Sequence, residues 1–205
     1  MAAEVGAWVI RSACAQVAEW RLMGVPNLHV AVNLFAAQLR APNFAATVEA
    51  VLEEFGLPAV ALEMEITENI VLHNEHGTIG PLTKLRSMGV GIAFDDYGTG
   101  FAALSSLKNY PLTRLKIDRS FVTDVCNDER DRAVVSAVLN LARGFGPAVT
   151  AEGIETREQA ILTLPPTSIQ LEVDSGGWFG RSGRGERRGL ARSWSLSGAA
   201  DPVAG

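Results

Sequence analysis

Apolar residues follow two different spacings along most of the chain. Leu28–Leu34 and Val90–Phe94 are short, mainly apolar runs, which are typical of strands buried inside a sheet. From Gly6 to Gly24, apolar residues instead recur at helical spacing. Both kinds of segment alternate, which favours a parallel sheet covered by helices on its outside. The predicted fold class is therefore α/β.

Glycine and proline residues mark the ends of several predicted elements. Gly24 with Pro26 ends the first helix, Gly56 with Pro58 ends the second, and Gly89 ends a later one. The predicted strands are Leu28–Leu34, Val60–Ile66, Val90–Phe94, Arg114–Ile117 and Ala148–Ala151. The predicted helices are Gly6–Gly24, Asn43–Phe55, Thr78–Met88, Ala102–Leu107 and Glu129–Ala142.

The composition of the chain changes after about residue 165. Residues 166–205 are rich in Gly, Ser and Arg, as in the stretch GGWFGRSGRGERRG, and no helical or strand period persists there. Such a composition is typical of a chain that cannot bury enough apolar surface to fold. We therefore expect one folded domain over residues 1–165 and a poorly ordered tail over residues 166–205.

Charge and hydropathy narrow the classes of partner and compartment. The formal net charge is −5, which argues against binding to a DNA or RNA polymer but leaves a small phosphate ligand open. Cys14 and Cys126 are far apart and have no metal-ligand spacing, as expected for free thiols in a reducing compartment. No stretch approaches the ~20 apolar residues of a membrane span. The sequence thus predicts a cytoplasmic protein without a membrane segment.

Polar residues stand at the ends of all five predicted strands. They are Asn33, Glu65, the pair Asp95–Asp96, Lys116 with Asp118, and Glu152, with Glu68 and Glu155 three residues beyond two of them. Since parallel strands carry their chemistry at their carboxyl ends, these groups should share one rim. Oxygen ligands without histidine or thiolate suit Mg²⁺ or Mn²⁺, and paired aspartates can bridge two ions. Such a site can activate water against a phosphodiester.

Each of these residues also has a purely structural interpretation. A strand-end carboxylate is often a helix N-cap or a solvated loop residue. Asn33 could cap a turn, Lys116 could simply pair with Asp118 or Glu152, and the aspartate pair could belong to a turn. The repetition at all five strands favours the metal site. No Ser–His, Cys–His or P-loop pattern is present, so a side-chain nucleophile is the weaker expectation.

Several ordered motifs resemble the EAL family, whose members hydrolyse cyclic di-GMP on a modified TIM-like barrel. In chain order the matching segments are GAWVIRSACAQVAEW, VAVNLFAAQL, LEMEITEN, GIAFDDYGTGFAALSSLKNYP, LTRLKIDRSFV and VTAEGIET. The resemblance extends from about Gly6 to Gln159. It implies cyclic di-GMP as substrate, linear pGpG as product, and one or two Mg²⁺ or Mn²⁺ ions as cofactors.

The resemblance also implies a role for each rim residue. The implied metal ligands are Asn33, Glu65, Asp95, Asp96 and Glu152. Lys116 would orient the attacking water or steady the phosphate charge, and Glu152 would share in catalysis. Asp118 and Glu155 would support the site or contact substrate. Glu68 would hold the loop that follows the aspartate pair.

Two departures from the family pattern lower the expected activity. The glutamate of the E-A-L signature and the first strands would precede Met1, and the expected Gln-Gly strand near Gln170 is not recognisable. The expectation is an incomplete TIM-like barrel of about five parallel strands with its outer helices retained. Its exposed edges would favour self-association or a homodimer. The predicted function is an impaired cyclic di-GMP phosphodiesterase. The alternatives are a non-catalytic cyclic di-GMP-binding or protein-interaction module, or a non-functional fragment.

Overall fold

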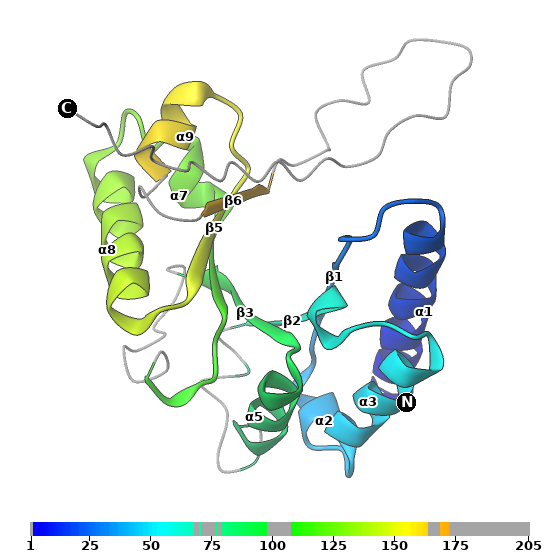
Figure 1. Ribbon diagram of the computed structural model, residues 1–205. Helices are drawn as coiled ribbons and strands as arrows, with labels where there is room; N and C mark the ends of the chain where they lie inside the picture. The colour runs from blue at the N-terminus through cyan, green and yellow to red at the C-terminus, as the bar shows by residue number, and fades with distance from the viewer. Residues whose placement is uncertain are drawn as a thin grey trace, which may run out of the picture.

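Six parallel strands form a single curved sheet (Figure 1). The computed structural model describes residues 2–67, 70, 77, 79–97, 108–163 and 169–172. The strands are β1 (Val30–Asn33), β2 (Leu62–Ile66), β3 (Gly91–Tyr97), β4 (Arg114–Ile117), β5 (Ala148–Glu152) and β6 (Ile169–Glu172). They lie side by side in chain order, and every neighbouring pair is parallel.

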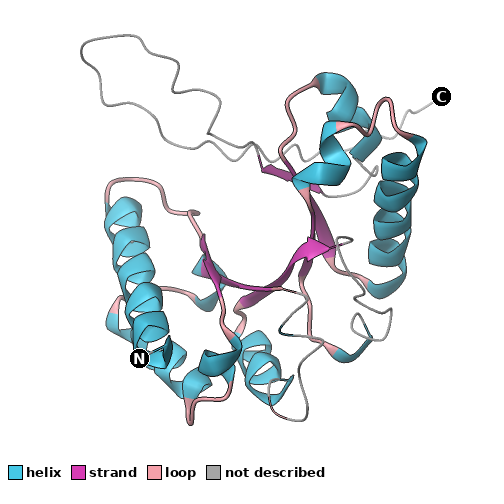
Figure 2. Ribbon diagram, turned by 180° about the vertical axis from the view of Figure 1, so that it is seen from behind, coloured by secondary structure: helices cyan, strands magenta, loops and turns pink. Residues whose placement is uncertain are grey.

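Helices connect the strands and lie along the outer side of the curved sheet (Figure 2). The helices are α1 (Ala2–Leu22), α2 (Ala36–Leu39), α3 (Phe44–Glu54), η1 (Ala59–Ala61), α5 (Ile79–Met88), α7 (Arg119–Thr123), α8 (Glu129–Phe145) and α9 (Arg157–Thr163). α8 begins at the N-cap Asp128, whose side chain accepts a hydrogen bond from the N–H of Arg130. It ends at Gly146, which has a φ of 94°. Glycine is favoured in this left-handed region of backbone conformation, so Gly146 is a suitable residue to end the helix.

The α/β architecture and the five predicted strands are confirmed. The sixth strand, β6, lies within the segment for which we expected a poorly ordered tail. The short helices α2, α7 and α9 were not predicted, because a helix of four to seven residues shows little apolar periodicity. The helix predicted at Ala102–Leu107 and most of the tail lie outside the described residues.

The hydrophobic core lies between the outer face of the sheet and the helices. Successive strand side chains point to opposite faces, so in β2 Leu62, Met64 and Ile66 share one face, and Glu63 and Glu65 share the other. Leu62, Met64 and Ile66 are almost fully buried, as are Leu82 and Leu85 of α5. The outer face is therefore apolar, and the inner, concave face carries the polar residues of the same strands.

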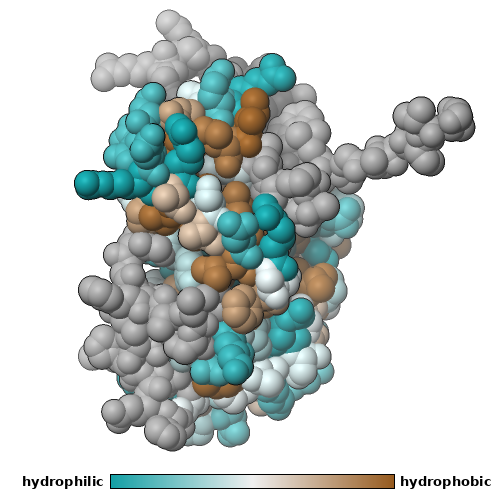
Figure 3. Space-filling view, turned by 90° about the vertical axis from the view of Figure 1, so that its left-hand side faces the viewer, coloured by the Kyte–Doolittle hydropathy of each residue, from teal (hydrophilic) through white to brown (hydrophobic). Residues whose placement is uncertain are grey.

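β1 and β6 are the two edges of the sheet within the described residues. On β1, the inner-face residues Ala31 and Asn33 are exposed, whereas Val32 on the outer face is buried. Seen from the side of α8 and α9, hydrophobic and hydrophilic residues are interspersed over the surface (Figure 3). Phe145 and Ile161, in these two helices, are among the exposed apolar residues.

Candidate functional site

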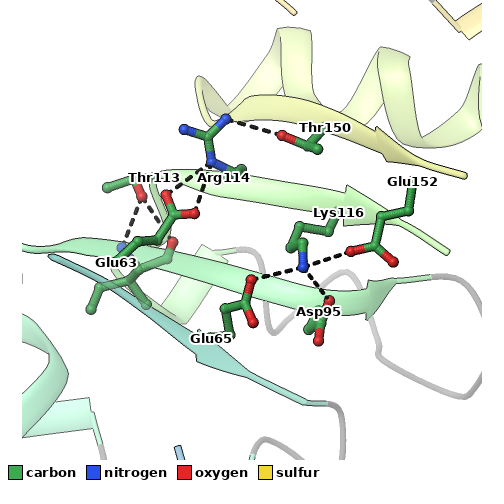
Figure 4. A network of polar contacts seen from close by, with 9 residues as sticks. Glu63, Glu65, Asp95, Thr113, Arg114, Lys116, Thr150 and Glu152 are labelled. Carbon is green, nitrogen blue, oxygen red and sulfur yellow. Dashed lines mark hydrogen bonds and ion pairs between the residues drawn. The ribbon is translucent and has the colours of Figure 1, made fainter. Parts of the chain in front are cut away.

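Four of the predicted rim residues meet at the carboxyl end of the sheet, on its inner face (Figure 4). They are Glu65 of β2, Asp95 of β3, Lys116 of β4 and Glu152 of β5. The strands are parallel and in sequential order, so their carboxyl ends meet at one edge. With Asp96, which follows Asp95 on β3, we call these five residues the rim cluster.

Lys116 occupies the centre of the rim cluster. Its Nζ lies 2.7 Å from Oε1 of Glu65 and 2.6 Å from Oε1 of Glu152. A third carboxylate oxygen, Oδ1 of Asp95, lies 3.1 Å away. The lysine side chain is only 7% exposed. The sequence left open whether Lys116 pairs with Glu152 or Asp118; in the structure Lys116 pairs with Glu152 and with two further carboxylates, those of Glu65 and Asp95.

The surrounding carboxylates keep Lys116 charged. Burial alone would lower the pKa of Lys116, but its hydrogen bonds to Glu152 and Glu65 raise the pKa well above the ordinary value. The charge of Asp95 adds to this increase. Lys116 therefore remains an ammonium group at neutral pH, so it can donate hydrogen bonds but cannot act as a general base.

A local irregularity in β3 brings two adjacent aspartates together. In a regular strand Asp95 and Asp96 would point to opposite faces. Here the register with β4 shifts between Phe94 and Tyr97, and Asp96 has a φ of 53°. The rings of Phe94 and Tyr97 pack edge to face with centroids 5.3 Å apart, although residues three apart in a regular strand face opposite ways. This β-bulge turns Asp96 toward the same site as Asp95.

Three carboxylates of the rim cluster could hold a divalent cation. Asp95, Asp96 and Glu152 each offer an oxygen, and these oxygens lie within 4.8 Å of one another. Oδ1 of Asp95 is buried and accepts no hydrogen bond from the described residues, although it forms an ion pair with Nζ of Lys116. Four carboxylates face one ammonium group, which leaves an excess of negative charge. These features fit a hard cation such as Mg²⁺ or Mn²⁺.

The pKa values of Asp96, within this group, and of Asp118, beside it, shift in opposite directions. Burial raises the pKa of Asp96, and the negative charges of Asp95 and Asp118 raise it further. Burial alone would also raise the pKa of Asp118, but hydrogen bonds from Ser120 lower it overall. Asp118 caps α7 and accepts from the backbone N–H of Ser120 at 2.9 Å. Asp118 thus serves as a helix cap and lies next to Asp96.

The remaining predicted residues lie at different distances from the rim cluster. Asn33 is aligned with Glu65 in the β1–β2 register, so both belong to the inner face, but its side chain is exposed at the sheet edge. Glu155 is 66% exposed and pairs with Arg119, with the atoms 2.7 Å apart. Glu68 lies outside the described residues. The roles assigned to these residues stay predictions.

A second polar group, which the sequence analysis missed, lies one layer deeper on the inner face (Figure 4). Arg114 Nε donates to both carboxylate oxygens of Glu63, at 3.1 and 2.9 Å, and a terminal nitrogen of Arg114 donates to Oγ1 of Thr150 at 3.1 Å. We call Glu63, Arg114 and Thr150 the inner layer. Polar residues two positions before Glu65, Lys116 and Glu152 were the available signal.

Comparison with known proteins identifies related sequences. The profile of the EAL domain matches residues 1–164. The cyclic di-GMP phosphodiesterase NbdA of Pseudomonas aeruginosa is 40% identical over 152 residues, which are 74% of this chain and 19% of NbdA. This chain spans about a fifth of the length of the curated relatives that it matches.

Solved structures agree in fold. The EAL domain of Mycobacterium smegmatis DcpA superposes with a TM-score of 0.73 at 42% identity, covering 78% of this chain and 72% of that domain. The PaMucR phosphodiesterase, solved as a complex with c-di-GMP, gives a TM-score of 0.70 at 36% identity, covering 78% and 64%. Among the described residues, no helix combines the length and apolar character needed to span a bilayer.

Proposed function

Because the chain belongs to the EAL domain family, we propose that it binds cyclic di-GMP and hydrolyses it to linear pGpG with Mg²⁺ or Mn²⁺. The observation that carries this proposal is the rim cluster, in which Asp95, Asp96 and Glu152 present oxygens within 4.8 Å of one another. Relatives named for this dinucleotide, including NbdA and the PaMucR complex, support the choice of substrate.

Most of the carboxylates would bind the cation, and Glu152 would in addition position Lys116. Asp95, Asp96 and Glu152 would hold the cation, with Glu65 and Asn33 on the neighbouring strands. A divalent ion held there supplies Lewis-acid chemistry, which activates water and stabilises negative charge on a phosphodiester. Glu152 both accepts a hydrogen bond from Lys116 and contributes an oxygen to the cation group, so it links the two parts of the site.

Lys116 would stabilise charge on the phosphate. Its ammonium group is permanently protonated at neutral pH and can donate to a phosphate oxygen or orient the attacking water. One water molecule is consumed: its oxygen bonds to phosphorus, the bond from phosphorus to the ribose O3′ breaks, and O3′ takes up one proton in place of the one that the water releases. Asp118, held beside Asp96 by the cap of α7, would limit the movement of Asp96.

A product assay tests the proposal. Purified chain is incubated with cyclic di-GMP and Mn²⁺, and the linear product is separated by chromatography. We expect product from the wild type and a loss of at least about 100-fold in Asp95→Asn. The matched control is Asp124→Asn, an exposed aspartate at the end of α7, which should retain activity.

The same samples distinguish the alternatives. Calorimetric binding of cyclic di-GMP without product would contradict hydrolysis and favour a non-catalytic receptor. Absence of both binding and product, from a chain with a cooperative thermal transition, would contradict the proposal altogether. Equal losses in Asp95→Asn and Asp124→Asn would show that the effect is not specific to the rim cluster.

A further inference from the structure

The inner layer stands in a fixed relation to the rim cluster. Glu63 precedes Glu65 by two residues, Arg114 precedes Lys116 by two, and Thr150 precedes Glu152 by two. Residues two apart in a strand share a face and lie roughly 7 Å apart along it. Each inner-layer side chain is therefore directly below a rim side chain on the same strand.

The contact between Glu63 and Arg114 passes over an intervening strand. Glu63 is on β2 and Arg114 on β4, with β3 between them. On β3 the facing residues are Gly91, in register with Glu63, and Ala93, in register with Arg114. A Cβ at Gly91 would lie 3.1 Å from both Cγ and Oε2 of Glu63. The absence of a side chain at Gly91 thus gives Glu63 room to reach across β3.

The inner layer is enclosed and its two charges balance. The side chain of Glu63 is 11% exposed and that of Arg114 15% exposed. A carboxylate in such surroundings needs a cation, because an unpaired buried charge is strongly destabilising. Arg114 supplies this cation, because its Nε donates to both oxygens of Glu63, and one of its terminal nitrogens links β4 to Thr150 of β5.

Lys116, in the rim cluster above the inner layer, has a side chain flexible enough to pair with a different carboxylate. A lysine side chain has four rotatable bonds, and its compact ammonium group has no fixed planar geometry. Glu63 and Glu65 lie on the same face of β2, and Lys116 shares the inner face of β4 with Arg114. Without the guanidinium, Glu63 would be an unpaired buried carboxylate one step below the ammonium group.

We propose that Arg114 is a positioning residue that, by occupying Glu63, keeps the ammonium group of Lys116 in the rim cluster. The consequence for turnover rests on the proposed function, but the location of the ammonium group does not. Arg114→Met should let Lys116 turn toward Glu63. Arg114→Met combined with Glu63→Met removes the competing carboxylate and should return Lys116 to the rim.

Lysine NMR gives a direct readout, since the chain contains only three lysines, Lys84, Lys108 and Lys116. The ammonium and Cε resonances are recorded without metal or cyclic di-GMP, and Lys116→Met assigns the signal. We expect the Lys116 signal to shift in Arg114→Met and to return in the double variant. A purely structural role predicts no such return, because the double variant lacks both contacts. The matched control is Arg132→Met, which removes an arginine that donates to the carbonyls of Val125 and Cys126, and should leave the signal unchanged.

Turnover supplies the second readout. In Arg114→Met, kcat should fall about 10-fold or more while KM changes little, and the double variant should regain most of kcat. Thermal melts verify folding. If Arg114→Met does not fold, Gly91→Ala decides the question, because its Cβ displaces Glu63 slightly and should move the Lys116 signal in the same direction.

The inference would be overturned if the Lys116 signal did not shift in folded Arg114→Met. Where Arg114→Met does not fold, an unshifted signal in folded Gly91→Ala would overturn it. So would a double variant in which the signal stays displaced. A shift that is reversed in the double variant, in a chain without any turnover, would support the inference and contradict only the proposed function.

Discussion

The inner layer and the rim cluster are built by the same strands yet differ in charge balance. In the inner layer one carboxylate faces one guanidinium, and the hydroxyl of Thr150 accepts from a second nitrogen of that guanidinium. In the rim cluster three carboxylates pair with one ammonium group, a fourth, that of Asp96, lies beside two of them, and one buried oxygen of Asp95 accepts no hydrogen bond from the described residues. A balanced buried pair is complete by itself, whereas an excess of carboxylates calls for a cation. Charge balance, rather than polarity alone, separates a supporting layer from a candidate site.

Lys116→Met should have the largest effect on stability. Removing the ammonium group leaves Glu65, Asp95 and Glu152 without their shared cation, so we expect the free energy of unfolding to fall by about 4 kcal/mol. Mn²⁺ should restore part of this loss. Urea unfolding at pH 7 with and without Mn²⁺ measures both effects. Exposed Lys84→Met is the control and should change little. If Lys116→Met were as stable as the wild type in the absence of metal, this would contradict the inferred excess of negative charge in the rim cluster.

The direction of the pKa shift of Lys116 determines the pH range over which this stability difference should be constant. Pairing raises the folded-state pKa of Lys116 above its unfolded value of about 10.4. The stabilisation is therefore fully present below that value and is lost only as the pH rises through the folded-state pKa. The difference between Lys116→Met and the wild type should not vary between pH 7 and pH 9 on account of Lys116 itself.

The inner layer should respond differently to single and double substitutions. Arg114→Met removes the guanidinium that pairs with buried Glu63, so Lys116 can pair with Glu63 only by leaving the rim carboxylates, and we expect a cost of about 3 kcal/mol of unfolding free energy. The Glu63→Met/Arg114→Met variant leaves no charge and should be within about 1.5 kcal/mol of the wild type. A double-mutant cycle by urea unfolding checks this. Strictly additive losses would show that the two residues are not energetically coupled.

The sequence predicted the strands and the identity of the rim residues, but not how they meet. Strand ends are visible as apolar runs followed by polar residues, so Glu65, Lys116 and Glu152 could be placed at one edge. The meeting of Asp95 with Asp96 depends on a β-bulge, and adjacent strand residues give no sign of one. The central position of Lys116 depends on the positions of three other strands, which only the assembled sheet determines.

Other features escaped the sequence analysis because their signals are weak. The pairing of Glu63 with Arg114 joins residues 51 positions apart and requires a small residue, Gly91, on the strand between them. β6 stands at the start of a Gly- and Ser-rich region, whose composition hid a strand of four residues. Local periodicity identifies long elements well, while contacts across a sheet depend on its register.

Asp96→Asn should stabilise the metal-free chain slightly. The raised pKa of Asp96 means that the folded chain holds this proton more tightly than the unfolded chain does, so above that pKa the charge is destabilising. We expect the Tm to rise by about 1–2 °C at pH 7. With Mn²⁺ the order should reverse, because the variant offers a weaker ligand. A fall of Tm without metal, or an undiminished effect of Mn²⁺, would contradict the assignment. Asp124→Asn is again the control.

The smallest effect is expected at an ion pair outside both polar groups. Arg11 of α1 pairs with Glu54 of α3 and lies over the ring of Phe55, 5.6 Å from its centroid. Its two terminal nitrogens each donate to one oxygen of Glu54, so both carboxylate oxygens are engaged, as are those of Glu63 in the inner layer, but Arg11 is 55% exposed and Glu54 39% exposed. Solvent screens such a pair, so Glu54→Gln should cost less than about 0.5 kcal/mol, and less still at high salt. Urea unfolding at two salt concentrations measures this. A loss as large as that of Arg114→Met would mean that burial does not determine the strength of these pairs, and the contrast between exposed and enclosed charges would fail.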